Sequence, residues 1–140
     1  MARTIASDCV GARIRMLNRK TSRIYDDAVR PHGLRFSQMN ILTVVRLHEP
    51  VAPVEVGRML ELEKSTLSRN VALMEAKGWI EVLPGEGNSQ LLRTTRKGRS
   101  LYAKAASSWR DAQRRVQSLL GGPTATQIRD AVDRIVRAGS

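Results

Sequence analysis

The sequence is poor in the residues that stabilise very small proteins. Its single cysteine, Cys9, excludes a disulfide within the chain and a metal site built on several cysteines. Aromatic residues make up only 4% of the 140 residues, whereas hydrophobic residues as a whole make up 41%. We therefore expect one domain whose single core consists mostly of Leu, Val, Ile, Ala and Met side chains.

Long hydrophobic runs and catalytic motifs are also missing. No apolar run approaches the roughly 20 residues of a transmembrane helix, and the first residues, MARTIASDC, lack the apolar stretch of a secretion signal. The sequence has no G-x-S-x-G, H-E-x-x-H or P-loop motif, and neither His32 nor His48 has evident metal-ligating neighbours. These absences predict a cytoplasmic protein that is not an enzyme, holds no metal or cofactor and does not bind a membrane.

Acidic residues are scarce relative to basic ones. There are 24 Lys and Arg against 13 Asp and Glu, so the net charge is +11 and the pI is near 11.2. This balance favours nucleic acid as the partner, with an anionic membrane surface as the second candidate. Only residues 36–63 are net acidic, because two basic residues there face four acidic ones and give −2.

The most informative stretch is EKSTLSRNVALMEAKG, residues 63–78. Leu67, Val71 and Met74 recur at spacings of four and three, which is one face of a helix. The other side carries short polar and cationic side chains, namely Lys64, Ser65, Thr66, Ser68, Arg69 and Asn70. Arg and Lys suit guanine or phosphate, Asn suits adenine, and Ser or Thr suits either. The pattern predicts a helix that lies on nucleic acid; the alternative is an ordinary solvated helix face.

Three helices are expected before this stretch. An apolar stripe runs along residues 8–30 and ends at Pro31 and Gly33. Ser37 is the expected N-cap of a helix over 37–48. That helix should bury five apolar residues: Ile41, Leu42, Val44, Val45 and Leu47.

A short third helix should run from Pro53 to Glu61, since Pro suits the first helical position. Its buried residues should be Val56, Met59 and Leu60. Residues 62–64 then form a tight connection to the helix over 63–78, and two short helices joined in this way are the helix-turn-helix pattern.

A hairpin is expected next. Gly78 is a suitable helix stop, residues 79–83 are rich in strand formers, residues 84–88 have turn composition, and residues 89–94 can return as a second strand. A helix-turn-helix followed by a hairpin is a winged helix, with residues 84–88 at the tip of the wing.

The last forty residues predict two more helices. Thr95 can cap a long helix over 96–120, in which Trp109 should lie at a subunit interface or line a ligand cavity. Residues 124–127 form a capping-box pattern that should open the last helix, with Ile128, Val132, Ile135 and Val136 facing inward. The expected fold is mainly α with a small β-hairpin wing.

The outer helices carry more apolar surface than a winged-helix core can cover. We therefore expect one domain, residues 1–140, in which residues 34–99 form a DNA-binding lobe while residues 5–30 and 100–138 mediate homodimerisation. The alternative is that the outer helices fold back on the centre of the same chain.

This order of elements resembles the MarR (multiple antibiotic resistance regulator) family of bacterial transcription factors. The resemblance is carried by IYDDAVRPHGLRFSQMNIL at 24–42, EVGRMLELEKSTLSRNVALMEAKGWIEV at 55–82 and LLRTTRKG at 91–98. It implies a homodimer that binds pseudo-palindromic double-stranded operator DNA. It also implies repression that is relieved by a small lipophilic or phenolic effector or by thiol oxidation.

The resemblance assigns DNA-contact positions to Ser65, Thr66, Ser68 and Arg69, while Lys64 and Asn70 match more variable positions. The arginine that family members commonly carry at the wing tip is absent, and Asn88 is in the matching stretch. Four cations nearer the base of the wing could still meet phosphate: Arg93, Arg96, Lys97 and Arg99. We therefore expect weaker minor-groove contact and greater dependence on the helix over 63–78.

Two further positions deserve a prediction. Glu61 stands where the family often has glycine, and we expect it to be tolerated because only a left-handed backbone would demand glycine. Cys9 is a candidate redox-sensing thiol; the alternative is a thiol with no regulatory role.

The main alternative to a sequence-specific regulator is a non-specific, basic architectural protein that binds nucleic acid. A third alternative is a winged helix that binds a partner protein.

Overall fold

The computed structural model describes residues 1–139, which form helices and one two-stranded antiparallel sheet. In chain order the elements are α1 (Ala2–Asp8), α2 (Val10–Val29), the 3-10 helix η1 (Arg30–His32), α3 (Phe36–His48), α4 (Pro53–Leu60), α5 (Lys64–Ala76), β1 (Ile80–Pro84), β2 (Gln90–Thr94), α6 (Arg96–Leu120) and α7 (Gly122–Ala138). The mainly α class with one hairpin is confirmed. No helix in the described part of the chain has the length and apolarity needed to span a membrane.

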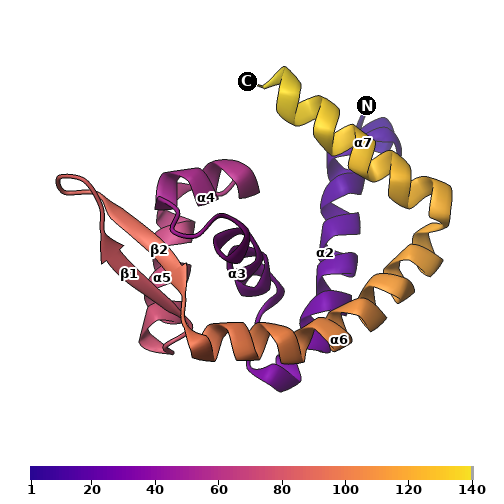
Figure 1. Cartoon of the computed structure of the whole chain (residues 1–140). Helices are drawn as coiled ribbons and strands as arrows, with labels where there is room; N and C mark the ends of the chain where they lie inside the picture. Colours follow the sequence, from indigo (N-terminus) through magenta and orange to yellow (C-terminus); the bar gives the residue numbers. More distant parts are fainter. Residues whose placement is uncertain (140) are drawn as a thin grey trace. The chain divides into compact units, whose positions relative to one another are not determined.

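The chain divides into two compact units. Unit 1 comprises Met1–Ala28 and the chain from Trp109 onward, and unit 2 comprises Val29–Ser108. In unit 2, α3, α4 and α5 pack beside the β1–β2 hairpin, whose tip extends away from the helices (Figure 1).

Unit 2 has its own hydrophobic core. Helix α3 contacts α4 and β2, and α5 contacts α4 and β1. The apolar side chains buried between them are Val29, Ile41, Leu42, Val45, Val56, Met74, Ile80 and Leu92. Each Å² of apolar surface that is buried contributes roughly 25 cal/mol to stability. Helices as short as α4 are not stable alone, so this packing stabilises them.

Three predictions about these helices are wrong. Leu47 is 73% exposed, because it lies on the side of α3 opposite Val45. Met59 is 43% exposed, at the edge of the apolar arc of α4. Ser37 does not cap α3, which begins one residue earlier with Arg35 as its N-cap. There the Gln38 side chain accepts a hydrogen bond from the Arg35 backbone N–H at 3.0 Å.

The hairpin is extended by a short pairing that the sequence did not reveal. Strands β1 and β2 pair antiparallel, with Val82 opposite Leu92. Leu92 also exchanges two backbone hydrogen bonds with Val51, at 3.0 and 2.8 Å. The segment between α3 and α4 therefore lies against the outer edge of the wing.

Helix α6 has the bounds that the sequence predicts. The Thr95 hydroxyl accepts a hydrogen bond from the backbone N–H of Gly98 at 2.9 Å, which makes Thr95 a true cap. Along this helix Ala105, Ala112 and Val116 are buried, whereas Leu119 is exposed.

Unit 1 leaves much of its apolar surface uncovered within the single chain. Ile14 and Leu17 of α2 are exposed, and so are Val132, Ile135 and Val136 of α7, contrary to the inward orientation expected for α7. Helix α7 also begins earlier than expected: Gly121 is its N-cap and Pro123 lies in its first turn, so residues 124–127 do not form a capping box.

A short polar contact links α2 to α6 inside unit 1. The Tyr25 hydroxyl donates a hydrogen bond to Oε1 of Gln113. Burial raises the pKa of the Tyr25 phenol above its usual value, since the charged form would lose solvation. Tyr25 therefore stays a neutral donor throughout the physiological pH range.

Candidate nucleic-acid interface

Helix α5 is fixed on one side by the core and exposed on the other. Leu67 and Met74 are buried and Val71 is half-buried, which confirms the predicted inner face. Gly78 ends the helix with φ of 74°, and Trp79 N–H donates to the carbonyl of Met74 at 2.9 Å. This left-handed stop turns the chain into β1.

The turn between α4 and α5 is tighter than the sequence suggests. Glu61 has φ 52° and ψ 42°, the left-handed region that is strained for a residue with a Cβ. Leu62 N–H then donates to the carbonyl of Gly57 at 2.9 Å. A Cβ on Gly57 would lie 3.3 Å from the Leu62 carbonyl oxygen, so the close approach of the two helices favours glycine there. The expectation that Glu61 avoids a left-handed backbone is wrong.

The outer face of α5 presents the predicted polar set to solvent. Lys64, Ser65, Ser68 and Arg69 are exposed, while Thr66 and Asn70 are half-buried. Asn70 Nδ2 donates to the carbonyl of Thr66 at 3.0 Å, within the helix. Within residues 1–139 the structure shows no side-chain hydrogen bond or ion pair for Lys64 or Arg69. These two cations are therefore available to an anionic partner.

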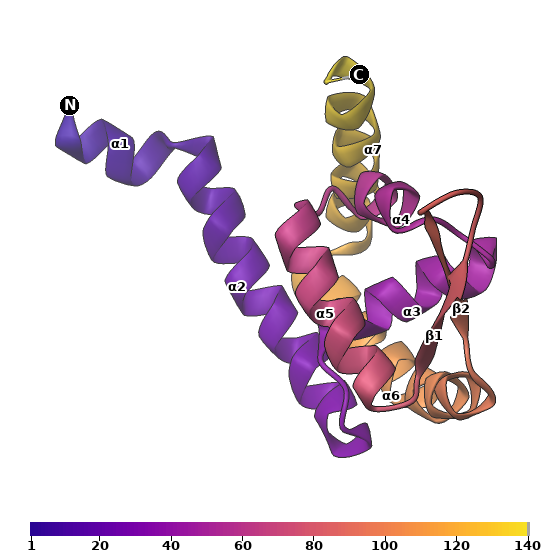
Figure 2. The same ribbon diagram turned by 90° about the vertical axis from the view of Figure 1, so that its left-hand side faces the viewer.

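The wing tip lies on the same side of unit 2 as the start of α5. Figure 2 shows the tip of the hairpin level with α4, at the end away from α6. A groove of about 910 Å³ is lined by residues of α4, the α4–α5 turn, Lys64 and Ser68 of α5, and Asn88 of the wing. The start of α5, the helix-turn-helix turn and the exposed Asn88 thus form one continuous surface.

Of the four basic residues predicted near the wing base, three are already engaged. The Arg93 guanidinium pairs with Oε1 of Glu81 across the hairpin, at 2.8 Å. Lys97 Nζ donates to the carbonyl of Lys77 at 2.9 Å. Arg96 is exposed, and no partner for its side chain occurs in the described part of the chain. Arg99 Nη1 donates to the carbonyl of Thr94 at 2.7 Å. Arg96 is therefore the most accessible of the four.

Sequence reasoning missed the contact that fixes the base of the wing. One carboxylate oxygen of Glu49 accepts hydrogen bonds from the backbone N–H of Thr94 at 2.6 Å and from its hydroxyl at 2.7 Å. The Thr94 carbonyl in turn accepts from Nη1 of Arg99 at 2.7 Å. No local sequence pattern predicts this contact of Glu49, because Thr94 is more than forty residues away in the chain.

The other singled-out residues lie away from this surface or inside the core. Cys9 is an exposed free thiol between α1 and α2. His32 Nε2 lies 3.0 Å from the Ser108 hydroxyl. Trp79 is buried and Trp109 is half-buried. No cluster of His, Cys, Asp and Glu suited to a metal ion occurs among the described residues.

Comparison with known proteins gives a consistent answer. The model of the MarR family matches residues 32–89. The multiple antibiotic resistance protein MarR of Escherichia coli is 27% identical over 81 residues, which are 58% of this chain and 56% of that protein's length. The chain thus spans only about half the length of that relative in the sequence match.

The solved structures extend the likeness to the whole fold. The transcriptional regulator MosR of M. tuberculosis, solved in complex with DNA, superposes with a TM-score of 0.84 and 28% identity, over 94% of this chain and 96% of that one. A mutant E. coli MarR in complex with operator DNA gives a TM-score of 0.83 at 20% identity, over 94% and 96% of the two chains.

The order of the helices, the hairpin and these matches define the fold class of the chain, a winged helix-turn-helix. Within that fold the chain is similar to proteins of the MarR family, whose model matches residues 32–89.

Proposed function

We propose that this protein is a sequence-specific DNA-binding transcriptional regulator that works as a homodimer. The observation that supports it best is the exposed face of α5, where Lys64 and Arg69 project without partners in the described chain beside Ser65 and Ser68. The base-reading chemistry of these side chains suits the major groove. The similarity to MosR, which was crystallised with DNA, supports the same assignment.

The exposed apolar side chains of unit 1 support the proposal of a homodimer. Its exposed large apolar side chains include Ile14 and Leu17 of α2 and Val132 and Ile135 of α7. Exposed apolar surface on this scale is typical of an interface rather than of a monomer. A dimer would place two α5 helices on half-sites one helical turn apart, about 10 base pairs centre to centre.

Repression with ligand release is the regulatory mode we propose. A ligand that binds better when the two α5 helices are misaligned would shift the population away from the DNA-competent form. In support, a mostly apolar cavity of about 340 Å³, lined by Leu17, Tyr25 and Val116 among others, lies within unit 1 and has the size of a small-ligand site. If no phenolic or lipophilic compound in a broad screen weakens operator binding, this part of the proposal fails.

Selection from random duplex DNA at about 150 mM salt tests the central claim, because non-specific affinity is weak there. A recovered pseudo-palindrome is the expected result. The rival is a non-specific architectural protein, which the net charge of +11 favours. No enriched sequence, together with binding that collapses as salt rises, would establish that rival.

Thiol regulation is a second candidate, favoured by the exposure of Cys9. Peroxide treatment of the wild type should then lower operator affinity, and Cys9→Ser should abolish the response. An unchanged wild-type affinity after peroxide would rule this mode out.

A further inference from the structure

The wing is a two-stranded ribbon with little support of its own. Strands β1 and β2 form a two-stranded sheet, and the side chains of residues 86–90 at its tip are all exposed. Figure 1 shows this tip extending away from the helices. A two-stranded hairpin alone is at best marginally stable in water. The direction in which the tip points is therefore set by the contacts at the base of the wing.

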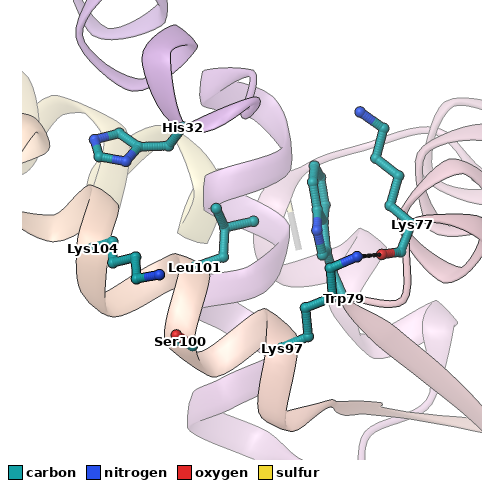
Figure 3. A pocket seen from close by; sticks show the side chains of 7 residues that line it. All are labelled: His32, Lys77, Trp79, Lys97, Ser100, Leu101 and Lys104. Atoms are coloured by element: carbon teal, nitrogen blue, oxygen red, sulfur yellow. Dashed lines mark hydrogen bonds between the residues drawn. The ribbon is translucent and has the colours of Figure 1, made fainter.

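Two of these contacts join the start of α6 to the end of α5. The Thr95 hydroxyl donates a hydrogen bond to the carbonyl of Gly78 at 2.5 Å. Lys97 Nζ donates to the carbonyl of Lys77 at 2.9 Å, as the dashed line in Figure 3 shows. Neither contact involves a residue of β1 or β2, so they fix where the hairpin begins and ends but not the direction of its strands.

The segment between α3 and α4 acts on β2 itself. The Glu49 carboxylate accepts hydrogen bonds from the backbone N–H of Thr94 at 2.6 Å and from its hydroxyl at 2.7 Å. Two residues further on, Val51 exchanges backbone hydrogen bonds with Leu92 at 3.0 and 2.8 Å. Thr94 and Leu92 are 2% and 0% exposed, so water does not compete for these contacts. Residues 49–51 thus hold two positions of the same strand.

Glu49 provides the strongest of these contacts, because hydrogen bonds to an ionised acceptor are about twice as strong as neutral ones. It also acts where a small movement has a large effect. Gln90, at the tip end of β2, lies four residues from Thr94, which is roughly 13 Å of strand. A rotation of about 15° at Thr94 would move Gln90 by about 3 Å, the length of a hydrogen bond.

We propose that Glu49 is a positioning residue for DNA binding, which directs the wing into the minor groove by holding Thr94. The inference rests on the proposed function and adds to it a residue that acts through the wing. Removal of the Glu49 charge alone would strengthen binding, since a carboxylate repels phosphate. A loss of affinity on removal of Glu49 would therefore report the lost hydrogen bonds and not the lost charge.

Protection of bases from dimethyl sulfate tests the proposal, because the reagent methylates guanine N7 in the major groove and adenine N3 in the minor groove. The full chain is bound to a duplex recovered by selection, with adenines in the flanking minor grooves. The wild type should protect both groups. Glu49→Ala should bind roughly fivefold more weakly, the equivalent of one hydrogen-bonded contact, and should lose protection of adenine N3 while guanine N7 stays protected. A purely structural role would weaken both protections together.

Further variants separate the hydrogen bonds from folding and from charge. Thr94→Ser keeps both donors and should retain the N3 protection, whereas Thr94→Val removes the hydroxyl at constant charge and should lose part of it. Glu49→Gln keeps an acceptor oxygen and replaces Glu49→Ala if that variant unfolds in a urea titration. Glu75→Ala is the matched control, since it removes an exposed carboxylate of α5 outside the wing base.

The outcomes separate this inference from the proposed function. Full N3 protection in Glu49→Ala, or an equal loss of it in Glu75→Ala, would overturn the positioning role alone. Protection of guanine N7 without adenine N3 in the wild type would also overturn it and would leave the proposed function intact. If selection enriches no duplex, or the wild type protects no base, both fail.

Discussion

At the scale of single residues, Glu61 is where this chain departs most clearly from the geometry its side chain prefers. Its φ of 52° places the residue in the left-handed region of the backbone. That conformation costs an L residue about 1–2 kcal/mol, because the Cβ lies too close to the following carbonyl oxygen. Glu61→Gly should therefore be more stable than Glu61→Ala by about 1 kcal/mol, measured by urea unfolding. Both variants remove the carboxylate, so their difference isolates the Cβ. The reverse order, which is normal at negative φ, would contradict the observed turn.

Gly98 illustrates the opposite case, a helical glycine that cannot be replaced. A Cβ there would lie 2.1 Å from the carbonyl oxygen of Trp79, which is backbone and cannot move aside cheaply. Gly98→Ala should destabilise the protein by about 1–3 kcal/mol, the usual cost of overpacking, although alanine normally favours a helix.

The control for this prediction is Gly122→Ala, in the first turn of α7. An added Cβ there meets no atom within 4 Å, so thermal unfolding should show no loss of stability. If Gly98→Ala were as stable as Gly122→Ala, the close packing of the start of α6 against Trp79 would be wrong.

At the scale of elements, local signals determined what could be predicted. Thr95 and Gly121 mark both ends of α6, so its bounds follow from the sequence. The inner face of α5 follows from its apolar spacing. By contrast, the Val51–Leu92 pairing and the Glu49–Thr94 contact join segments that lie far apart in the chain. Only tertiary packing brings them together, so no sequence window contains the signal.

The two DNA-facing elements should contribute unequally. Arg69 on α5 has a side chain with no partner in the described chain, whereas the wing tip offers Asn88 where a cation would reach the minor groove. Arg69→Ala should cost on the order of 1–3 kcal/mol of operator affinity, with relaxed specificity if it contacts guanine. Asn88→Ala should cost distinctly less. Fluorescence anisotropy on the selected operator measures both.

Equal losses for Arg69→Ala and Asn88→Ala would show that the wing reads DNA as strongly as α5. A uniform loss on every sequence for Arg69→Ala would instead indicate a phosphate contact. Glu81→Gln is a third variant for this measurement, because it removes the carboxylate that pairs with the Arg93 guanidinium across the hairpin. If phosphate competes with Glu81 for Arg93, this variant should bind any duplex more tightly at low salt.

At the scale of the whole molecule, the distribution of exposed apolar side chains is the basis for predicting a dimer. Ile135 on α7 of unit 1 is 72% exposed and Leu47 on α3 of unit 2 is 73% exposed, so their substitutions are matched in exposure. Ile135 has exposed apolar neighbours in Val132 and Val136, which together make the kind of patch that a second copy would cover. Leu47 has no such role in the proposed dimer.

Ile135→Asp should therefore convert the dimer to a monomer at micromolar concentration, and Leu47→Asp should leave it a dimer, as measured by light scattering. A carboxylate in an apolar interface loses its solvation without gaining a partner, which is a large penalty against association. Because a pseudo-palindrome engages both α5 helices at once, Ile135→Asp should also lose most of the operator affinity while its binding to a single half-site stays unchanged. A monomeric wild type, or dissociation caused by Leu47→Asp, would mean that the apolar surface of unit 1 has another purpose.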